Sequence, residues 1–444
     1  MDPRSTSRRT LLGALVTAPL AATALSACGG GSAGPGQPAE GGASIWYLTG
    51  QPKEGIRDAY VAAFNEASDD GQLTATPFEN DAYKSKIRTA IGAGQAPTII
   101  YGWGGGTMRS YAEAGHIEDL TDWFAENPEV HDRLLDSVWP AATVDGRIWA
   151  VPNETVQPIV MFYNNRLFEQ VGAQPPATWD ELLALVPVFT QAGIAPISLA
   201  GQSRWTTMMW LEFLFDRVGG PELFQAIYDA QPDAWSAPDS LKALTMAQDL
   251  VRAGGFVDGF NSIVADQNAD QALLYTDRAA MMLHGTWTYG SMKVDGGDFV
   301  SGGHLGYGNF PTVTGGKGDP SNSVGNPAQY FYLSSSATDE EKDLAKRFFA
   351  EGLMTNEVIT AFITEAGEVP VVKGVEDQLT QAEDPEWMDF VYQTVSGASF
   401  FGQSWDQALL PVSAEELLTN IERLFQLSIT PEEFAANMNA VLGQ

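Results

Sequence analysis

From residue 44 onward the chain alternates short apolar runs with segments whose apolar residues recur at helical spacing. Residues 44–48 and 98–101 suit buried strands, and residues 56–64 between them carry the pattern of one helix face. The second run leads directly into a glycine turn at 102–106, after which a new helix is expected. Strand, helix, strand, glycine turn and helix is the order of a parallel α/β sheet, so we predict an α/β fold.

Capping boxes predict where several later helices begin. Thr178, Thr338, Ser413 and Thr430 are each followed three residues later by a glutamate. A hydroxyl at the N-cap and a glutamate at the third helical position satisfy backbone N–H groups that the helix itself leaves unpaired. The C-terminal part of the chain is therefore predicted to be mostly helical.

Length and charge limit the classes of function. The chain has 444 residues, and at about 100–200 residues per domain two domains are expected. Its 24 lysines and arginines against 56 aspartates and glutamates give a net charge of −32. A groove that tracks phosphates needs clustered cations, as does a face that binds anionic lipids. The charge therefore disfavours both nucleic-acid binding and membrane binding through a basic surface.

No motif for catalysis, metal or phosphate binding is present in the sequence. None of the four histidines has the spacing of a metal site, and a single cysteine makes a multi-cysteine site impossible. Neither the Gly-x-Ser-x-Gly elbow nor a phosphate-binding glycine loop occurs. We therefore expect no cofactor and no metal.

The N-terminus has the order of an export signal. Arg4, Arg8 and Arg9 precede an apolar stretch at 11–25, and Pro19 breaks this stretch. At roughly 15 residues it is shorter than the ~20 needed to span a bilayer, so it is interpreted as a signal peptide. The paired arginines resemble a Tat signal, and the sequence leaves Tat and Sec export both open.

Cys28 closes this segment in the sequence Leu-Ser-Ala-Cys, which resembles a bacterial lipobox. The resemblance implies that residues 1–27 are removed and that Cys28 is acylated, palmitate being an expected acyl group. The alternative is that Cys28 is an incidental residue near a frayed terminus. Residues 28–43 are rich in Gly, Ser, Pro and Ala, which predicts a flexible tether between the lipid and the folded body.

Several further segments together resemble the extracellular solute-binding proteins of bacterial ABC importers, in particular those that bind sugars. The segments that carry the likeness are 96–100, 146–152, 161–165, 176–182 and 279–287. With the lipobox they run through nearly the whole chain. Each is weak alone, but their number and order are specific.

The resemblance implies a periplasmic-binding-protein fold of type II, in which a hinge joins two discontinuous α/β lobes around a ligand cleft. We place the first lobe at 44–155 plus 289–335 and the second at 156–288 plus 336–444. The resemblance also implies an ABC permease in the membrane as partner, an extracytoplasmic location through the lipid at Cys28, and a monomer.

Sugars present hydroxyl rims and apolar C–H faces, so a site for them needs flat aromatic surfaces with polar groups at their edges. Trp103 lies in the glycine turn after a buried strand, where ligands bind in parallel sheets. Trp287 lies at the second expected lobe crossing. Trp205 and Trp405 lie in polar loops before helices, and Trp46 lies in the first strand. These five are the aromatic candidates, and the alternative for each is packing in the core. The tryptophans interpreted as structural are Trp123, Trp139, Trp179, Trp210, Trp235 and Trp387.

Polar candidates lie at expected strand ends and crossings. Asn80 and Asp81 follow residues 76–78, which are interpreted as a further strand after 44–48, although this pair is also typical of a simple turn. Glu154 and Gln157 lie at the first crossing, and Asp406 neighbours Trp405. The same reasoning adds Asn326, Gln329 and Arg204, the last of which suits a surface charge equally well.

These observations favour a lipoprotein that captures an oligosaccharide by hinge closure and delivers it to a permease, with no catalytic residue. Residues 205–212 and 217–222 resemble proteins that bind xylobiose-type β-linked disaccharides.

The rival to a binding protein is an extracellular glycoside hydrolase, which would add two carboxylates about 5–9 Å apart to the same aromatic cleft. With 56 acidic residues, the sequence leaves that rival open. A third alternative, an adhesion protein, would lack a buried cleft.

Overall fold

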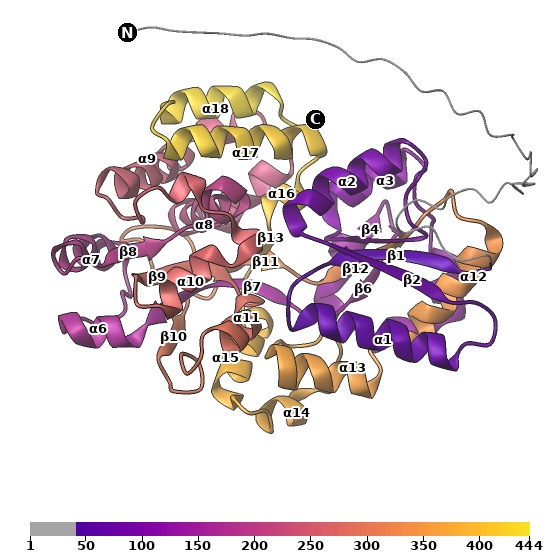
Figure 1. The fold of residues 1–444 in the computed structure, drawn as a ribbon. Helices are drawn as coiled ribbons and strands as arrows, with labels where there is room; N and C mark the ends of the chain where they lie inside the picture. Colours follow the sequence, from indigo (N-terminus) through magenta and orange to yellow (C-terminus); the bar gives the residue numbers. More distant parts are fainter. Residues whose placement is uncertain (1–40) are drawn as a thin grey trace, which may run out of the picture. The chain divides into compact units, whose positions relative to one another are not determined.

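A computed structural model describes residues 41–444 (Figure 1). The predicted signal at 1–27, the predicted lipid attachment at Cys28 and the predicted tether up to residue 40 lie outside the described residues. Within 41–444, no helix combines the length and the apolar character that crossing a membrane requires.

The first sheet has the strand order β2-β1-β3-β12-β6. Its strands are β1 (Ala43–Leu48), β2 (Leu73–Phe78), β3 (Ile99–Gly102), β6 (Val151–Asn153) and β12 (Gln329–Leu333). The first three are parallel, whereas β12 is antiparallel to both β3 and β6. The helices that contribute to its core are α1 (Lys53–Ala67), α2 (Asn80–Gly92), α3 (Gly105–Glu113), α4 (Thr121–Glu126), α5 (Pro128–Asp132), α11 (Thr288–Asp295), α12 (Asp339–Arg347), α13 (Asn356–Ala361), α14 (Glu376–Thr380) and α15 (Pro385–Ser396).

The second sheet has the order β13-β11-β7-β9-β8, with β10 paired to β7. Its strands are β7 (Gln157–Asn164), β8 (Ala195–Ser198), β9 (Ala279–Gly285), β10 (Leu305–Gly308), β11 (Ser323–Asn326) and β13 (Phe401–Gln403). The helices of its core are α6 (Asn165–Val171), α7 (Trp179–Gln191), α8 (Trp205–Tyr228), α9 (Pro238–Arg252), α16 (Trp405–Ala408), α17 (Pro411–Phe425) and α18 (Pro431–Ala440). Helix α10 (Ala269–Tyr275) buries Leu274 in the core of the first sheet instead. A small separate pair is formed by β4 (Thr143–Val144) and β5 (Arg147–Ile148). The predicted α/β class is confirmed.

Alternate residues of β7 divide between two hydrophobic cores. Val160 and Phe162 belong to the core of the first sheet, whereas Ile159 and Met161 pack with the helices of the second core. Successive side chains of a strand point to opposite faces, so β7 is covered on both sides. A strand covered on both faces reads as an unbroken apolar run, which is how the sequence of β7 reads.

The sheets divide the chain at points that differ from the expected lobe boundaries. The chain first passes from one sheet to the other between β6 and β7. The segment 289–335 does not belong wholly to the first lobe, because β10 and β11 both pair with β7 and only β12 joins the first sheet. The segment from 336 does not begin the second lobe either, because α12 buries Leu344 in the core that contains Ile45 of β1.

Candidate ligand-binding cleft

A cavity of about 200 Å³ is lined by residues at the strand ends of both sheets. From the first sheet, Trp103 directly follows β3, and Asn80 is the first residue of α2. From the second, Gln157 is the first residue of β7 and Asn326 is the last of β11. Strand ends and the helix starts beside them are the usual place for a ligand in α/β sheets.

Three half-buried indoles supply aromatic surface to this cavity: Trp103, Trp205 and Trp287. The ring centroids of Trp205 and Trp287 are 6.2 Å apart, and the His284 ring contacts these two edge-on at 5.4 and 5.5 Å. Trp103 comes from the first sheet, where Tyr101 packs edge-on against it at 5.4 Å. Aromatic faces therefore enter the cavity from both lobes.

Lys84 connects the lobes beside these rings. Its Nζ lies 5.1 Å from the ring centroid of Trp103 and 5.8 Å from that of Trp205. The same atom is 2.9 Å from Oδ2 of Asp406, at the start of α16. An ammonium group at this distance from an indole face is attracted by the ring. Lys84 therefore bridges the first lobe to two groups of the second.

Asp81 fixes the position of Trp205 without lining the cavity itself. The indole Nε1–H of Trp205 donates to Asp81 Oδ1 at 3.1 Å, and the Ser203 hydroxyl donates to Oδ2 at 2.9 Å. The backbone N–H of Asp81 in turn donates to Asp266 Oδ2 at 2.9 Å. The first turn of α2 is thus hydrogen-bonded to the second lobe at three points.

Asp266 gives this contact a pH dependence. Burial raises the pKa of its carboxyl from 3.8 to about 6, and the negative charges of Asp81 and Glu79 add to the shift, against the opposing effects of the Asp81 N–H and of Lys84. A pKa raised in the folded state means that ionised Asp266 costs stability above about pH 6, and that this cost disappears as the pH falls. We expect the protein to gain stability relative to Asp266→Asn between about pH 7 and about pH 5. Denaturant unfolding at both pH values measures this, and parallel pH profiles for the two proteins would contradict it.

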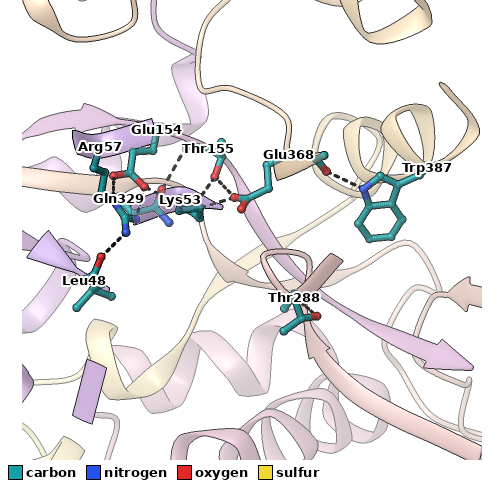
Figure 2. Close-up of polar contacts among 11 residues, drawn as sticks. Leu48, Lys53, Arg57, Glu154, Thr155, Thr288, Gln329, Glu368 and Trp387 are labelled. Atoms are coloured by element: carbon teal, nitrogen blue, oxygen red, sulfur yellow. Dashed lines mark hydrogen bonds and ion pairs between the residues drawn. The ribbon is translucent and has the colours of Figure 1, made fainter. Parts of the chain in front are cut away.

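A buried ionic cluster adjoins the cavity, and two of its members, Lys53 and Arg57, line the cavity; Figure 2 shows the contacts within the cluster. Arg57 donates from Nε and Nη2 to the two carboxylate oxygens of Glu154 at 2.8 and 2.7 Å. Lys53 Nζ is 3.0 Å from Glu368 Oε2 and 3.3 Å from Glu154 Oε2, and the Thr155 hydroxyl donates to Glu368. Burial opposes ionisation of Glu154, but Arg57 and Lys53 outweigh it and hold its pKa below the ordinary value. Because Lys53 and Arg57 line the cavity, the cluster connects the cavity to the backbone around Glu154.

The backbone around Glu154 is where the chain crosses between the lobes. Glu154 has a φ of 60°, a left-handed conformation that non-glycine residues seldom adopt. Its carbonyl accepts from Val371 N–H at 3.0 Å, and Val156 N–H donates to the Val369 carbonyl at 2.9 Å. The side chain of Gln329, the first residue of β12, accepts from Thr155 N–H at 3.2 Å. The cluster therefore holds together the crossing at 154–157, the return near 329 and the segment 368–371.

Two of the aromatic candidates are corrected by the structure. Trp405 is fully buried, with its ring 4.8 Å from Phe224 and 5.3 Å from Trp235, because α16 turns it into the core while Asp406 and its neighbours face the cavity. Trp46 is 6% exposed and packs on Phe78 at 5.0 Å, inside the first lobe rather than on the cavity wall.

Several polar candidates also lie elsewhere than expected. Glu154 is wholly buried in ion pairs and does not line the cavity, and Gln329 is buried near it at the crossing. Asp81 acts behind Trp205, as described above, and Arg204 pairs with Glu415 at 3.1 Å on the surface. The candidates that do line the cavity are Asn80, Trp103, Gln157, Trp205, Trp287, Asn326 and Asp406. Their role in binding stays a prediction.

Sequence reasoning missed Lys84, Lys53 and Arg57. Lys84 follows Asn80 by four residues on α2, so the two share a helix face, and this spacing was a usable signal. Lys53 and Arg57 have the same spacing on α1, but nothing in the sequence marks that helix start as facing a ligand. Among residues 41–444, no group of three His, Cys, Asp or Glu side chains is arranged as a metal site.

Comparison with known proteins gives a consistent result. The family described as bacterial extracellular solute-binding protein matches residues 50–357. A probable sugar-binding periplasmic protein of Mesorhizobium japonicum is 27% identical over 228 residues, which cover 50% of this chain and 52% of that protein. The chain spans about half the length of the curated relatives it matches.

Solved structures match over more of the chain. One comes from work on xylan utilization by Caldanaerobius polysaccharolyticus; it is 26% identical, with a TM-score of 0.80, and the match covers 90% of this chain and 99% of that one. A chitin oligosaccharide binding protein has a TM-score of 0.81 at 24% identity, with 90% and 98% coverage. The two-lobed α/β arrangement expected above is that of these structures.

Proposed function

This chain belongs to the bacterial extracellular solute-binding protein family, and from that premise we propose that it captures an oligosaccharide outside the cell for import by an ABC permease. The supporting observation is the set of three half-buried indoles, one from the first lobe and two from the second, around a single cavity. Indole faces suit the C–H faces of sugar rings, and the polar groups between them suit hydroxyls.

The charged groups of the cavity favour a neutral ligand. Lys53, Arg57 and Lys84 line it, and so do Glu79, Asp266 and Asp406, so the two signs are balanced. Each cation donates hydrogen bonds and each carboxylate accepts them, which is what a ring of hydroxyls requires. An anionic or cationic solute would find no matching excess of opposite charge.

Capture works by closure of the two lobes. A ligand that contacts Trp103 on one lobe and Trp287 on the other favours the closed arrangement by its difference in affinity for the two states. The permease then distinguishes closed from open protein. No covalent step is involved, and the protein acts as a monomer.

A β-linked disaccharide of the xylobiose type is the ligand we propose. Its support is the likeness of residues 205–212 and 217–222 noted above, together with the match to a structure from work on xylan utilization. Titration calorimetry against xylo-, chito- and malto-oligosaccharides tests this, with xylobiose expected to bind in the micromolar range, about −8 kcal/mol. Chromatography of the same mixtures tests the rival hydrolase, since any shortened sugar would contradict a binding protein.

We also propose that acylated Cys28 anchors the protein to the outer face of the cell membrane. Two or more acyl chains hold a protein on a bilayer, whereas one chain binds only marginally. Cys28→Ser is expected to shift the exported protein from the membrane fraction to the medium and to abolish incorporation of labelled palmitate. Cys28→Ser protein that remains in the membrane fraction would contradict the anchor without affecting the sugar site.

A further inference from the structure

A polar contact joins the two lobes on the side of the cleft away from the backbone crossings. β2 and β8 are the outermost strands of their sheets, whereas β6, after which the chain first crosses between the lobes, is the opposite edge of the first sheet. Helix α2 follows β2, and the turn Gly201–Ser203 follows β8. When two lobes rotate about their crossings, the parts farthest from the crossings move most, so this contact forms and breaks with closure.

Two carboxylates, one from each lobe, form this contact. The Asp81 carboxylate of the first lobe accepts from the Ser203 hydroxyl and the Trp205 indole, and the Asp81 N–H donates to Asp266. On the side of the second lobe, the Ser203 hydroxyl accepts from the Ala265 N–H at 3.0 Å, so the two turns that meet α2 are joined to each other. We call Asp81, Ser203, Trp205 and Asp266 the rim contact.

The charges around Asp266 make closure of the rim contact sensitive to protons. Its half-buried carboxyl lies against the first turn of α2, where Asp81 and the preceding Glu79 carry the same charge. Lys84, one turn further along α2, opposes them, but its ammonium pairs with Asp406 at 2.9 Å. Opening of the lobes would return Asp266 to water and separate it from both carboxylates. The closed form therefore holds a proton on Asp266 more tightly than the open form does.

Charged side chains on the other neighbouring elements have partners of their own. Arg204 pairs with Glu415 at 3.1 Å on the surface. Oδ2 of Asp270, on α10, lies 3.3 Å from Nε2 of His284. The proton affinity of Asp266 in the closed form is therefore set by burial and by the charged groups on and just before α2.

We propose that the rim contact is a latch that takes up a proton on Asp266 as the lobes close, so that the protein holds its ligand more tightly in mildly acidic than in neutral medium. The proposal rests on the proposed function and adds a regulation of the same cleft. Asp81 is then a positioning residue, because it holds the Trp205 indole at the cavity wall from the opposite lobe without lining the cavity itself. Contacts made only in the closed form add to the affinity for a ligand that binds this form.

Titration calorimetry of the mature protein at pH 7 and pH 5 measures the effect, with the sugar of the xylo-, chito- or malto-series that binds it. Affinity is expected to rise up to about ten-fold from pH 7 to pH 5. Titrations at pH 5 in two buffers that differ in ionisation enthalpy are expected to show uptake of up to about one proton with the ligand. Equal affinities at the two pH values, without proton uptake, would overturn the latch.

Asp266→Asn keeps an oxygen that accepts from the Asp81 N–H but has no proton to gain. This variant is expected to bind the sugar with the same affinity at pH 7 and pH 5. Asp406→Asn is the matched control, because it neutralises another carboxylate of the cavity, one that pairs with Lys84. The control is expected to keep the pH response. A response that survives in Asp266→Asn, or that is lost equally in Asp406→Asn, would overturn the latch.

Asp81→Ala removes the acceptor for Trp205 and Ser203, and is expected to weaken binding about ten-fold at both pH values although Asp81 does not line the cavity. Asp81→Asn keeps an oxygen for the indole N–H and is expected to recover most of that loss. Thermal unfolding without ligand verifies that both variants are folded. Unchanged affinity in Asp81→Ala, or an equal loss in Asp81→Asn, would overturn the positioning role.

Small-angle X-ray scattering of the ligand-free protein separates the latch from the proposed function. Acidification from pH 7 to pH 5 is expected to reduce the radius of gyration of the unaltered protein, whereas Asp266→Asn is expected to have the same radius at both pH values. Failure of all three sugar series to bind would overturn the proposed function. In that case, equal radii of the unaltered protein at the two pH values would overturn the latch as well, and a smaller radius at pH 5 that Asp266→Asn abolishes would support it.

Discussion

Trp287→Ala is expected to weaken oligosaccharide binding by about 1–3 kcal/mol, a loss of roughly 5- to 150-fold, while leaving the melting temperature close to that of the unaltered protein. The indole is half-buried and lines the cavity, with Trp205 6.2 Å from it, centroid to centroid. It lies against the backbone of Gly285, where an added Cβ would come within 1.8 Å of the ring. Removing the indole therefore takes a ligand surface away from the cavity and little from the core. Titration calorimetry and thermal unfolding measure the two effects separately.

Trp405→Ala is the matched control, because it removes the same side chain from the opposite environment. Trp405 is fully buried among Phe215, Phe224 and Trp235. Its loss is expected to lower the free energy of unfolding by about 3–5 kcal/mol through the cavity it leaves. If Trp287→Ala destabilised the fold as much and left affinity unchanged, Trp287 would be a core residue and the indole cleft would be refuted.

The contrast between these two tryptophans shows where sequence reasoning ends. Trp103 and Trp405 both lie in short loops beside small or polar residues, and both were predicted to reach a ligand. Composition gives no information on which way a helix start is rotated. In α16 the rotation buries Trp405 and turns the next residue, Asp406, into the cavity. Trp103, in contrast, lines the cavity, as expected of a turn at the carboxyl end of a parallel strand, although its contact with a ligand stays a prediction.

The fold was more predictable than the site, because periodicity and capping are local. The strands expected at 44–48 and 98–101 are β1 and β3, and the helices expected over 56–64 and after residue 106 are α1 and α3. Thr178, Thr338 and Thr430 form the expected capping boxes. Ser413 does not, because α17 already begins at Pro411 and the Ser413 hydroxyl donates to the Val441 carbonyl instead.

Sheet membership was the part that local patterns could not give. Nothing in the sequence of β10 or β11 distinguishes a strand that pairs with β7 from one that pairs with β3, since either sheet would bury it. The pairing depends on residues far away in the chain, and the lobe boundary in 289–335 was misplaced for that reason. The ionic cluster was missed for a related reason: Arg57 and Glu154 are 97 positions apart.

Glu154→Ala is expected to lower the free energy of unfolding by about 3–5 kcal/mol, since it leaves a buried guanidinium without its partner. The Arg57 side chain is 3% exposed and that of Glu154 is fully buried, so water cannot replace the lost hydrogen bonds.

The double variant Arg57→Met with Glu154→Met removes both charges of this pair. The double variant is expected to lose less free energy of unfolding than Arg57→Met and Glu154→Met lose in sum, because no uncompensated charge remains. Denaturant unfolding of the unaltered protein, Arg57→Met, Glu154→Met and the double variant gives the coupling energy, and additive losses would show that the pair is not coupled.

The dependence of stability on pH tests whether the ionised form of Glu154 is the one that stabilises the fold. Its pKa is held below the ordinary value of 4.5 in the folded protein, so its contribution to stability is present above pH 4.5 and is lost as the pH falls through the lower, folded-state pKa. The stability difference between the unaltered protein and Glu154→Gln should therefore be constant near neutral pH and shrink in acid. This trend is opposite in sign to that expected for Asp266, where stability is gained between about pH 7 and about pH 5.

Glu154 lies at the lobe crossing and pairs with Lys53 and Arg57, which line the cavity. If the cluster holds these two cavity residues in place, Glu154→Gln should also weaken ligand binding at neutral pH. An unchanged affinity together with reduced stability would limit the cluster to a role in folding.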